Sequence, residues 1–209
     1  MFYPVYLNLK GRRVVVVGGG EVAERKVESL MPCQASVIVI SPDVTAWLSA
    51  LFDQKRIEWL ARPYMKGDCA RATLVFSATD DAEVNRAVYV EATALGIFVN
   101  TADQPELCSF IMPAVVRRGH IGIAISTSGT SPALAARLRR KISRVIGPEY
   151  GQFSQLMVRA RREIRSRVAS ERERKELHYR IIDSDIIKLL RSNDREAAER
   201  RLNEMIQNP

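Results

Sequence analysis

The amino-acid sequence predicts an α/β fold, in which a Rossmann-like, doubly wound parallel sheet precedes a small α/β element and a helical C-terminal domain. Two observations lead to this prediction. Short apolar runs alternate with helix-like patterns in the first half, at 13–17, 35–40, 57–60, 73–78 and 97–100. Beyond about residue 150, the apolar spacing is helical throughout. Strands that alternate with helices indicate a parallel sheet with right-handed crossovers.

The first strand and the glycine turn after it are the most informative stretch. Val14–Val17 are four β-branched residues in a row, which is typical of a strand buried on both faces of a parallel sheet. The pattern Gly18-x-Gly20-x-x-Ala23 then opens a helix over 21–31 and fits the dinucleotide-binding fingerprint. A bare tight turn is the alternative. The candidate cofactor-binding residues here are Gly18, Gly19, Gly20, Glu21, Val22 and Ala23.

Each residue type in this turn has a physical reason. Gly18 allows the sharp turn, Gly20 lets a pyrophosphate approach the backbone, and Ala23 lets the helix pack close to the strand. The phosphates would lie at the helix N-terminus, where unpaired N–H groups and the helix dipole favour anions.

The second strand ends at Pro42 and Asp43, about where an acid in this fold binds the ribose hydroxyls. The sequence has no Arg or Lys between Ala35 and Gln54 that could hold a 2′-phosphate. It therefore predicts NAD rather than NADP. The alternative for Asp43 is a helix cap or a turn residue.

The other elements of the first half follow in order. We expect a helix over 44–52, a third strand over 57–60, a brief helical turn capped by Asp68, and a fourth strand over 73–78. Asp81 is the expected N-cap of a helix through 95, and the fifth strand spans 97–100. Ligands bind outside the carboxyl ends of such strands, so the segments 77–80 and 100–103 should line the cofactor cleft.

The second half has a different pattern of secondary structure, with one or two short strands followed by helices. We expect a strand over 121–126, with Val115 and Val116 beginning a strand before it. A Ser/Thr-rich loop over 126–131 then opens a helix over 132–146, with Pro132 in its first turn. Further helices are expected at 150–168, 170–182, 184–190 and 194–206. The predicted domains are therefore 1–113, 114–148 and 149–209.

Composition and charge narrow the function classes. The 209 residues are 46% hydrophobic and 27% charged, which is typical of a globular protein. No apolar run is long enough to span a bilayer, the N-terminus has no signal-peptide pattern, and three scattered cysteines fit a reducing cytoplasm.

The net charge of +8 is unevenly distributed. Residues 1–113 carry 11 Lys/Arg against 13 Asp/Glu, whereas residues 114–209 carry 21 against 11. The second half therefore calls for an anionic partner, which could be nucleic acid, a membrane surface or a polycarboxylate ligand.

Asp103 is the candidate for chemistry. It follows the fifth strand on the cleft side, where its carboxylate could accept the proton that leaves during a dehydrogenation. A plain turn residue is the alternative.

The loop 126–131 is either an anion-binding helix start or a simple cap, and the arginines after it are either a solvated face or a ligand contact. His120 and His178 have no partners at metal-ligand spacing, so we expect no protein metal site.

Five motifs in order resemble the precorrin-2 dehydrogenase and sirohydrochlorin ferrochelatase family, the family of sirohaem synthase N-terminal domains. The resemblance covers about residues 1–150 well and the helical tail more loosely. The motifs are Val17–Lys26, Ala78–Asp81 with Val84–Asn85, Val99–Asp103, Ser109–Ala114 and Ser126–Pro132.

The resemblance implies NAD-dependent oxidation of precorrin-2 to sirohydrochlorin, with Asp103 as the catalytic aspartate. In some members it also implies insertion of ferrous iron, so Fe²⁺ would be a chelatase substrate. It implies a homodimer in which the segment after Pro113 exchanges between subunits, making 114–148 a dimerisation domain. The cofactor contacts that it implies lie at Gly20–Val22, Pro42, Asp43, Ala78, Thr79, Asp80, Asn100 and Thr101.

The resemblance also places the tetrapyrrole, a polycarboxylate, in a basic cleft. The regulatory phosphoserine of some members falls on Thr127, and Ser128 stands where Gly is usual. The candidate substrate-binding residues are Ser126, Thr127, Ser128, Thr130 and Arg137.

A different class of function is also compatible with the charge. An NAD(H)-sensing regulator could bind nucleic acid through the basic helical half. The sequence shows no helix-turn-helix signature and no basic stretch interleaved with aromatic residues. The prediction is therefore a cytoplasmic enzyme without a nucleic-acid or membrane partner.

Overall fold

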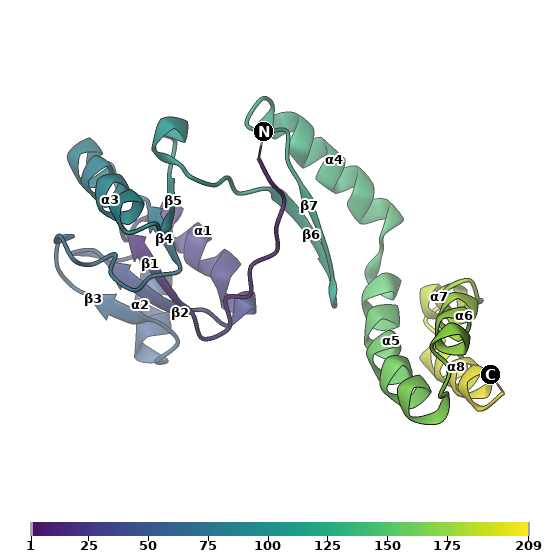
Figure 1. The fold of residues 1–209 in the computed structure, drawn as a ribbon. Helices are drawn as coiled ribbons and strands as arrows, with labels where there is room; N and C mark the ends of the chain where they lie inside the picture. Colours follow the sequence, from purple (N-terminus) through teal and green to yellow (C-terminus); the bar gives the residue numbers. More distant parts are fainter. Residues whose placement is uncertain (1, 209) are drawn as a thin grey trace. The chain divides into compact units, whose positions relative to one another are not determined.

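The computed structural model describes residues 2–208, and its contacts divide the chain into two compact units (Figure 1). The first unit extends to Ile111, and the second begins at Met112. Each unit is described by itself. The finer division of the second unit at residue 148 stays a prediction.

The first unit contains a five-stranded, fully parallel sheet in the order β3-β2-β1-β4-β5, which confirms the predicted fold class. The central strand β1 is flanked on both sides, and Val14–Val17 are buried. The fifth strand begins one residue later than predicted and includes Thr101. The strands are β1 (Arg13–Val17), β2 (Ser36–Ile40), β3 (Glu58–Leu60), β4 (Leu74–Ser77) and β5 (Phe98–Thr101).

Helices cover both faces of the sheet. Helices α1 (Glu21–Leu30) and α2 (Ala46–Asp53) pack on the face that carries Val14 and Val16. Helix α3 (Ala82–Ala94) packs on the other face, against Val15 and Val99. The predicted N-cap Asp81 is confirmed, because its carboxylate accepts hydrogen bonds from the N–H groups of Glu83 and Val84.

Helix α2 begins two residues later than predicted. Thr45 is its N-cap, and the hydroxyl oxygen accepts a hydrogen bond from the N–H of Leu48 at 3.3 Å. The alternative interpretation of Asp43 as a helix cap is therefore wrong. Two 3₁₀ turns that were not predicted follow α1 and β5, at η1 (Met31–Cys33) and η2 (Pro105–Leu107).

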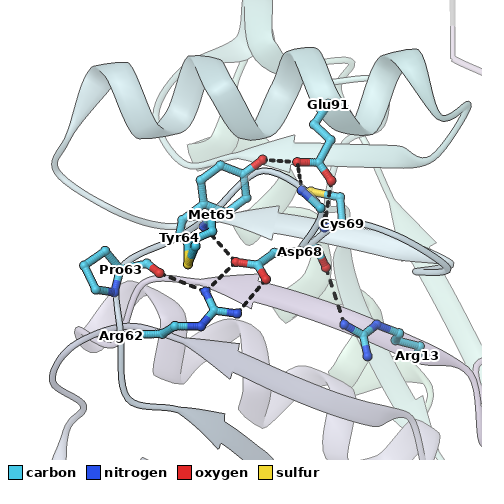
Figure 2. A network of polar contacts seen from close by, with 9 residues as sticks. Arg13, Arg62, Pro63, Tyr64, Met65, Asp68, Cys69 and Glu91 are labelled. Atoms are coloured by element: carbon cyan, nitrogen blue, oxygen red, sulfur yellow. Dashed lines mark hydrogen bonds and ion pairs between the residues drawn. The ribbon is translucent and has the colours of Figure 1, made fainter.

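The crossover from β3 to β4 contains turns instead of a helix, and polar contacts hold it (Figure 2). The Arg62 guanidinium donates to both carboxylate oxygens of Asp68, at 2.8 and 2.7 Å. Asp68 also accepts from the N–H of Met65, which precedes it in the chain. The prediction that Asp68 caps a helical turn is thus wrong, and its carboxylate instead closes the loop on itself.

Glu91 on α3 ties the same crossover to the helix. Its carboxylate accepts hydrogen bonds from the Tyr64 hydroxyl and from the N–H groups of Gly67 and Cys69 (Figure 2). Burial raises the pKa of Tyr64, and the bond to Glu91 raises it further. Burial likewise raises the pKa of the Cys69 thiol to about 12. Both groups therefore stay protonated and act as fixed structural partners.

The second unit joins a β-hairpin to helices. The strand expected to begin at Val115 is confirmed, since β6 pairs antiparallel with β7 around Gly119 and His120. The long helices pack against this hairpin, and the last four share a core around Ile164, Ile181 and Leu202. The predicted helices are confirmed with ends within two residues. The elements are β6 (Ala114–Arg118), β7 (Ile121–Ile125), α4 (Pro132–Val145), α5 (Pro148–Arg167), α6 (Glu171–Ile182), α7 (Ile186–Arg191) and α8 (Arg195–Gln207).

The Arg62–Asp68 pair makes stability depend on pH. Hydrogen bonding to Arg62 lowers the pKa of Asp68 below its unfolded value, so the pair stabilises the fold above that unfolded value. The contribution is lost as the pH falls through the folded pKa. We expect Asp68→Asn to lower Tm by about 2–4 °C at pH 7. At pH 3 the difference from wild type should be smaller.

Thermal unfolding followed by circular dichroism measures both values. Asp53→Asn is the matched control, because Asp53 is an exposed acid at the end of α2. An Asp68→Asn variant with the same loss of Tm at pH 3 as at pH 7 would contradict the assignment of this stability to the ion pair.

Candidate active site

Four neighbouring strands end at the same edge of the parallel sheet, and the site residues predicted in the first unit lie at these strand ends or directly after them. The fingerprint residues follow β1, Pro42 and Asp43 follow β2, Ala78–Asp80 follow β4, and Asp103 follows β5. The sheet therefore brings together residues that lie up to 85 positions apart in the sequence. This edge is where doubly wound sheets bind nucleotides.

Gly18 and Gly19 pack the tip of β1 against the two neighbouring loops. Gly18 has φ +114°, and a Cβ there would lie 2.2 Å from the carbonyl oxygen of Ala78. A Cβ on Gly19 would lie 1.9 Å from the carbonyl oxygen of Asp43. The N–H of Thr45 also donates to the carbonyl of Gly19 at 3.0 Å. Only glycine lets these three backbone segments approach so closely.

Gly20 differs from its two neighbours because the space beside it is open. It is the N-cap of α1 with φ −79°, and a Cβ there would meet no atom within 4 Å. The N–H groups of Glu21 and Val22 find no acceptor among the residues that the structure describes. These unpaired donors at an exposed helix start fit a pyrophosphate.

The loop after β2 leaves the Asp43 carboxylate accessible. Asp43 is exposed, and its side chain makes no hydrogen bond or ion pair within the described part of the chain. A neighbouring cleft of about 510 Å³ lies between the first turns of α1 and α2. Its lining residues are Glu21, Glu24, Arg25, Thr45, Ala46 and Trp47. The carboxylate is free to accept bonds from ribose hydroxyls, and that contact stays a prediction.

A buried amide fixes the loop after β4. The hydroxyl of Ser77 donates to Asn85 Oδ1 at 2.7 Å, and Asn85 Nδ2 donates to the carbonyl of Thr79 at 3.0 Å. Ser77 and Asn85 are both buried. The loop 78–80 is thus held from α3. The sequence analysis quoted Asn85 in a motif and gave it no role.

Asp103 follows the end of β5, where the backbone is fixed by hydrogen bonds of Thr101 to Leu107 and Cys108. Asp103 is exposed with φ +57°, a left-handed conformation in which Asp is more common than most residues. Its carboxylate makes no hydrogen bond or ion pair with a described residue. The hydroxyl of Thr101 donates to the carbonyl of Leu107, and its N–H donates to the Cys108 sulfur at 3.2 Å.

Asn100, like Thr101, is a predicted site residue whose side chain forms hydrogen bonds inside the protein. It is 7% exposed, its Oδ1 accepts from Lys26 Nζ at 3.1 Å, and its Nδ2 donates to the carbonyl of Phe110 at 3.0 Å. A cofactor contact at Asn100 would therefore involve the backbone. Sequence reasoning missed Lys26 and Cys108, because neither follows a strand end in the chain.

The predicted substrate residues lie in the second unit, in the loop before α4. The Thr127 hydroxyl donates to the carbonyl of Ser131 and accepts from its N–H, and Ser131 caps α4 by accepting from the N–H of Leu134. Ser128 has φ +53°, the conformation for which glycine is favoured. Arg137 is exposed. That Ser126, Thr127, Ser128, Thr130 and Arg137 bind the substrate stays a prediction.

The described residues contain neither a metal-binding cluster nor a membrane-spanning helix. Within residues 2–208, no cluster of three or more His, Cys, Asp or Glu side chains is arranged to hold a metal ion. Over the same residues, no helix combines the length and apolar character needed to cross a membrane.

Three family models match consecutive parts of the chain. A family described as "Putative NAD(P)-binding" matches residues 5–114. "Sirohaem biosynthesis protein central" matches residues 118–144, and "Sirohaem synthase dimerisation region" matches residues 149–206. The model that carries the dimerisation label thus falls on the helical part, whereas the sequence analysis gave that role to 114–148.

Full-length relatives are similar over nearly the whole chain. A siroheme synthase of Thioalkalivibrio sulfidiphilus is 38% identical over 206 residues, which are 99% of this chain and 42% of that protein. One from Methylobacillus flagellatus is 37% identical over 97% of this chain and 44% of its own length. The chain thus spans less than half the length of these curated relatives.

A solved structure is similar over both full chains. It is titled "SirC, precorrin-2 dehydrogenase", and it covers 100% of each chain with a TM-score of 0.83 and 28% sequence identity. The similarity therefore includes both units described above.

The three glycines should respond differently to the same added methyl group. Gly18→Ala and Gly19→Ala force a backbone shift, and we expect each to cost about 1–3 kcal/mol of unfolding free energy. Gly20→Ala meets open space, so its stability should stay within about 1 kcal/mol of wild type. If the pyrophosphate lies on Gly20, that same variant should bind NAD at least about tenfold more weakly, by loss of one close contact.

Urea unfolding and calorimetric titration with NAD separate these effects. A stable Gly20→Ala protein with wild-type affinity for NAD would place the pyrophosphate elsewhere. Equal stability of all three variants would contradict the packing described at Gly18 and Gly19.

Proposed function

Because the chain belongs to the NAD(P)-binding family of sirohaem biosynthesis, the family of sirohaem synthase N-terminal domains, we propose that it oxidises precorrin-2 to sirohydrochlorin with NAD. The reaction removes one hydride and one proton from the tetrapyrrole, giving NADH and H⁺. The observation that supports it best is the meeting of an uncapped glycine turn and an unpaired Asp103 carboxylate at one sheet edge.

Different residues of the first unit bind different parts of the dinucleotide. The N–H groups at Gly20, Glu21 and Val22 receive the pyrophosphate, with Gly18, Gly19 and Ala23 allowing the close packing behind them. Asp43 beside Pro42 accepts from the ribose hydroxyls. When bound, NAD supplies the acceptor for the hydride. The nicotinamide half is bordered by Ala78, Thr79, Asp80, Asn100 and Thr101.

Asp103 receives the proton in this proposal. Its carboxylate is exposed at the strand end and has no hydrogen bond within the described chain, so it is available to a bound substrate. The backbone beneath it is held by the bonds of Thr101 to Leu107 and Cys108. A fixed backbone with a free side-chain oxygen suits a general base.

The second unit supplies the positive charge for the substrate. Precorrin-2 carries acetate and propionate groups, and residues 114–209 carry the excess of Lys and Arg. We assign the carboxylates of the substrate to Arg137 and to the loop residues Ser126, Thr127, Ser128 and Thr130. The Thr127 hydroxyl is bonded within its own loop, which gives this loop a defined shape to bind against.

Two further expectations, on the domain boundaries and on the cellular compartment, belong to the same proposal. The division at 1–113, 114–148 and 149–209 lies near the limits of the three family models. A reducing compartment such as the cytoplasm suits Cys33, Cys69 and Cys108, none of which forms a disulfide within the described residues. The comparisons give no support to the nucleic-acid-binding regulator, and we do not propose it.

Asp103→Asn tests the catalytic assignment. The amide keeps the size of the side chain and removes its basicity, so we expect the dissociation constant for NAD to stay within about twofold. Sirohydrochlorin formation from precorrin-2 should fall at least about 100-fold. Glu106→Gln, an exposed acid three residues later, is the matched control. Unchanged turnover by Asp103→Asn would remove Asp103 from the mechanism.

The same assay run with ferrous iron tests chelatase activity. Iron uptake into sirohydrochlorin without NAD would establish a second activity of this chain. Absence of uptake, with normal oxidation of precorrin-2, would make it a dehydrogenase alone.

We also propose a homodimer formed through the second unit. Residues 149–206 of this unit match the family model described as "Sirohaem synthase dimerisation region". Of the residues of α4, Ala135 is buried, while Leu134 and Val145 are 47% and 67% exposed. These apolar side chains are candidates for the contact with a second copy.

Sedimentation equilibrium tests this proposal. Wild type should sediment at twice the chain mass of 23.5 kDa. Leu134→Asp with Val145→Asp should weaken the association at least about tenfold. Val90→Asp on α3 is the control, since Val90 is 57% exposed in the first unit. A monomeric wild type would contradict the proposal, and dissociation by the control alone would place the interface elsewhere.

A further inference from the structure

The loop after β4 is held by an amide that is itself buried. Asn85 lies on α3 and is 2% exposed, and Ser77 at the end of β4 is 0% exposed. The Ser77 hydroxyl donates to Asn85 Oδ1 at 2.7 Å, and Asn85 Nδ2 donates to the carbonyl of Thr79 at 3.0 Å. Because a carbonyl only accepts, the amide nitrogen must face Thr79, and the orientation of the Asn85 side chain is therefore defined.

The preceding peptide of this loop is fixed against β1. The N–H of Ala78 donates to the carbonyl of Val17 at 2.8 Å. The carbonyl oxygen of Ala78 lies where a Cβ on Gly18 would approach it to 2.2 Å, so this carbonyl packs directly against the glycine turn. Two successive carbonyls of the loop, those of Ala78 and Thr79, thus face other parts of the protein.

The N–H groups of the same two peptides have no acceptor in the protein. In a trans peptide the C=O and N–H bonds point in opposite directions, and the described chain has no cis peptide bond. The N–H of Thr79 therefore points away from Gly18. For the same reason the N–H of Asp80 points away from Asn85. Neither group donates to any residue between 2 and 208, whereas the next N–H, that of Asp81, donates to Thr79 Oγ1 at 2.9 Å.

We propose that Asn85 is a positioning residue for the dinucleotide. By holding the carbonyl of Thr79, it turns the Thr79–Asp80 peptide so that the Asp80 N–H donates to an oxygen of bound NAD. Water can accept from this donor in the free protein, and a ligand oxygen meets a donor whose direction is already set. The inference rests on the proposed function, because it needs NAD at this sheet edge, and it assigns Asn85 itself no contact with the cofactor.

Asn85→Ala tests the positioning role against a matched loss of packing. It removes both hydrogen bonds of the amide, so the dissociation constant for NAD in calorimetric titration should rise about tenfold. Val88→Ala is the control, since Val88 is 0% exposed on the same helix and packs in the core against the sheet. The control should also lower Tm, yet keep the dissociation constant within about twofold. A wild-type constant in Asn85→Ala, or equal weakening by both variants, would overturn the proposal.

Asn85→Asp allows the missing donor to be restored in a single protein. The new side chain keeps an acceptor for the Ser77 hydroxyl, but only its protonated form donates to the carbonyl of Thr79. Burial favours that protonated form, so the NAD affinity relative to wild type should be weakest near about pH 8 and should recover as the pH falls to about 5. A deficit that stays the same over this range would contradict the role of the donor to Thr79.

Amide exchange in ¹⁵N-labelled wild type decides the question even if no Asn85 variant folds. Saturating NAD should slow exchange of the Asp80 N–H at least about tenfold. Equal slowing by ADP-ribose, which lacks the nicotinamide, would assign the acceptor to the shared half of the ligand, and slowing by NAD alone would assign it to the carboxamide. Unslowed exchange at Asp80 in NAD-bound protein would overturn the inference. A wild type that binds no NAD at all would instead contradict the proposed function.

Discussion

The approach of three backbone segments at Gly18 and Gly19 is the constraint on which the rest of the site depends. At Gly18 and Gly19, the tip of β1 lies so close to the carbonyls of Ala78 and Asp43 that no Cβ fits. This packing sets the loops after β2 and β4 beside the start of α1. The unpaired N–H groups of Glu21 and Val22 thus face a space already bordered by these two loops. A ligand entering there meets donors whose positions need little reorganisation.

The backbone groups at the outer edge of β5 find hydrogen-bond partners without another strand. These bonds fix the end of the strand from which Asp103 follows. The segment after η2 folds back so that Ser109 exchanges hydrogen bonds with Val99, and Cys108 exchanges them with Thr101. A side-chain hydroxyl and a thiol thereby replace the ladder partners of a neighbouring strand. On the opposite face, Glu91 ties the crossover after β3 to α3. The segment after β5 is thus anchored to the sheet, and the chemistry is carried on a rigid sheet edge.

The sequence was sufficient for the parts of the fold that depend on local pattern. Four successive valines indicated a strand buried on both faces, and the glycine turn after them indicated where the helix begins. The start of α2 was misplaced because Thr45 and Asp43 are both good caps in isolation, and the contact of Asp43 with Gly19 was not visible. Asp68 was misassigned for a similar reason. Its contact with Arg62 forms only when the irregular loop folds, so the sequence pattern did not indicate it.

For the site, too, the sequence was sufficient only where the position of a residue follows from local pattern. Strand ends could be listed from the sequence, so Asp43, the 78–80 loop and Asp103 could be predicted as site residues. Lys26 could not be, because it reaches β5 from a helix 74 residues away and meets Asn100 only in the folded sheet. The pattern around Lys26 also looks like an ordinary polar helix face.

Hydrogen–deuterium exchange with and without NAD tests the central claim most directly. The account predicts that NAD slows exchange in the segments 18–23 and 78–80, while exchange within α5–α8 stays unchanged. Protection of the glycine turn by NAD but not by equal NADP would also support the assignment of Asp43. Unchanged exchange over 18–23 at saturating NAD would contradict the account, because the dinucleotide would then bind away from the sheet edge on which every other assignment depends.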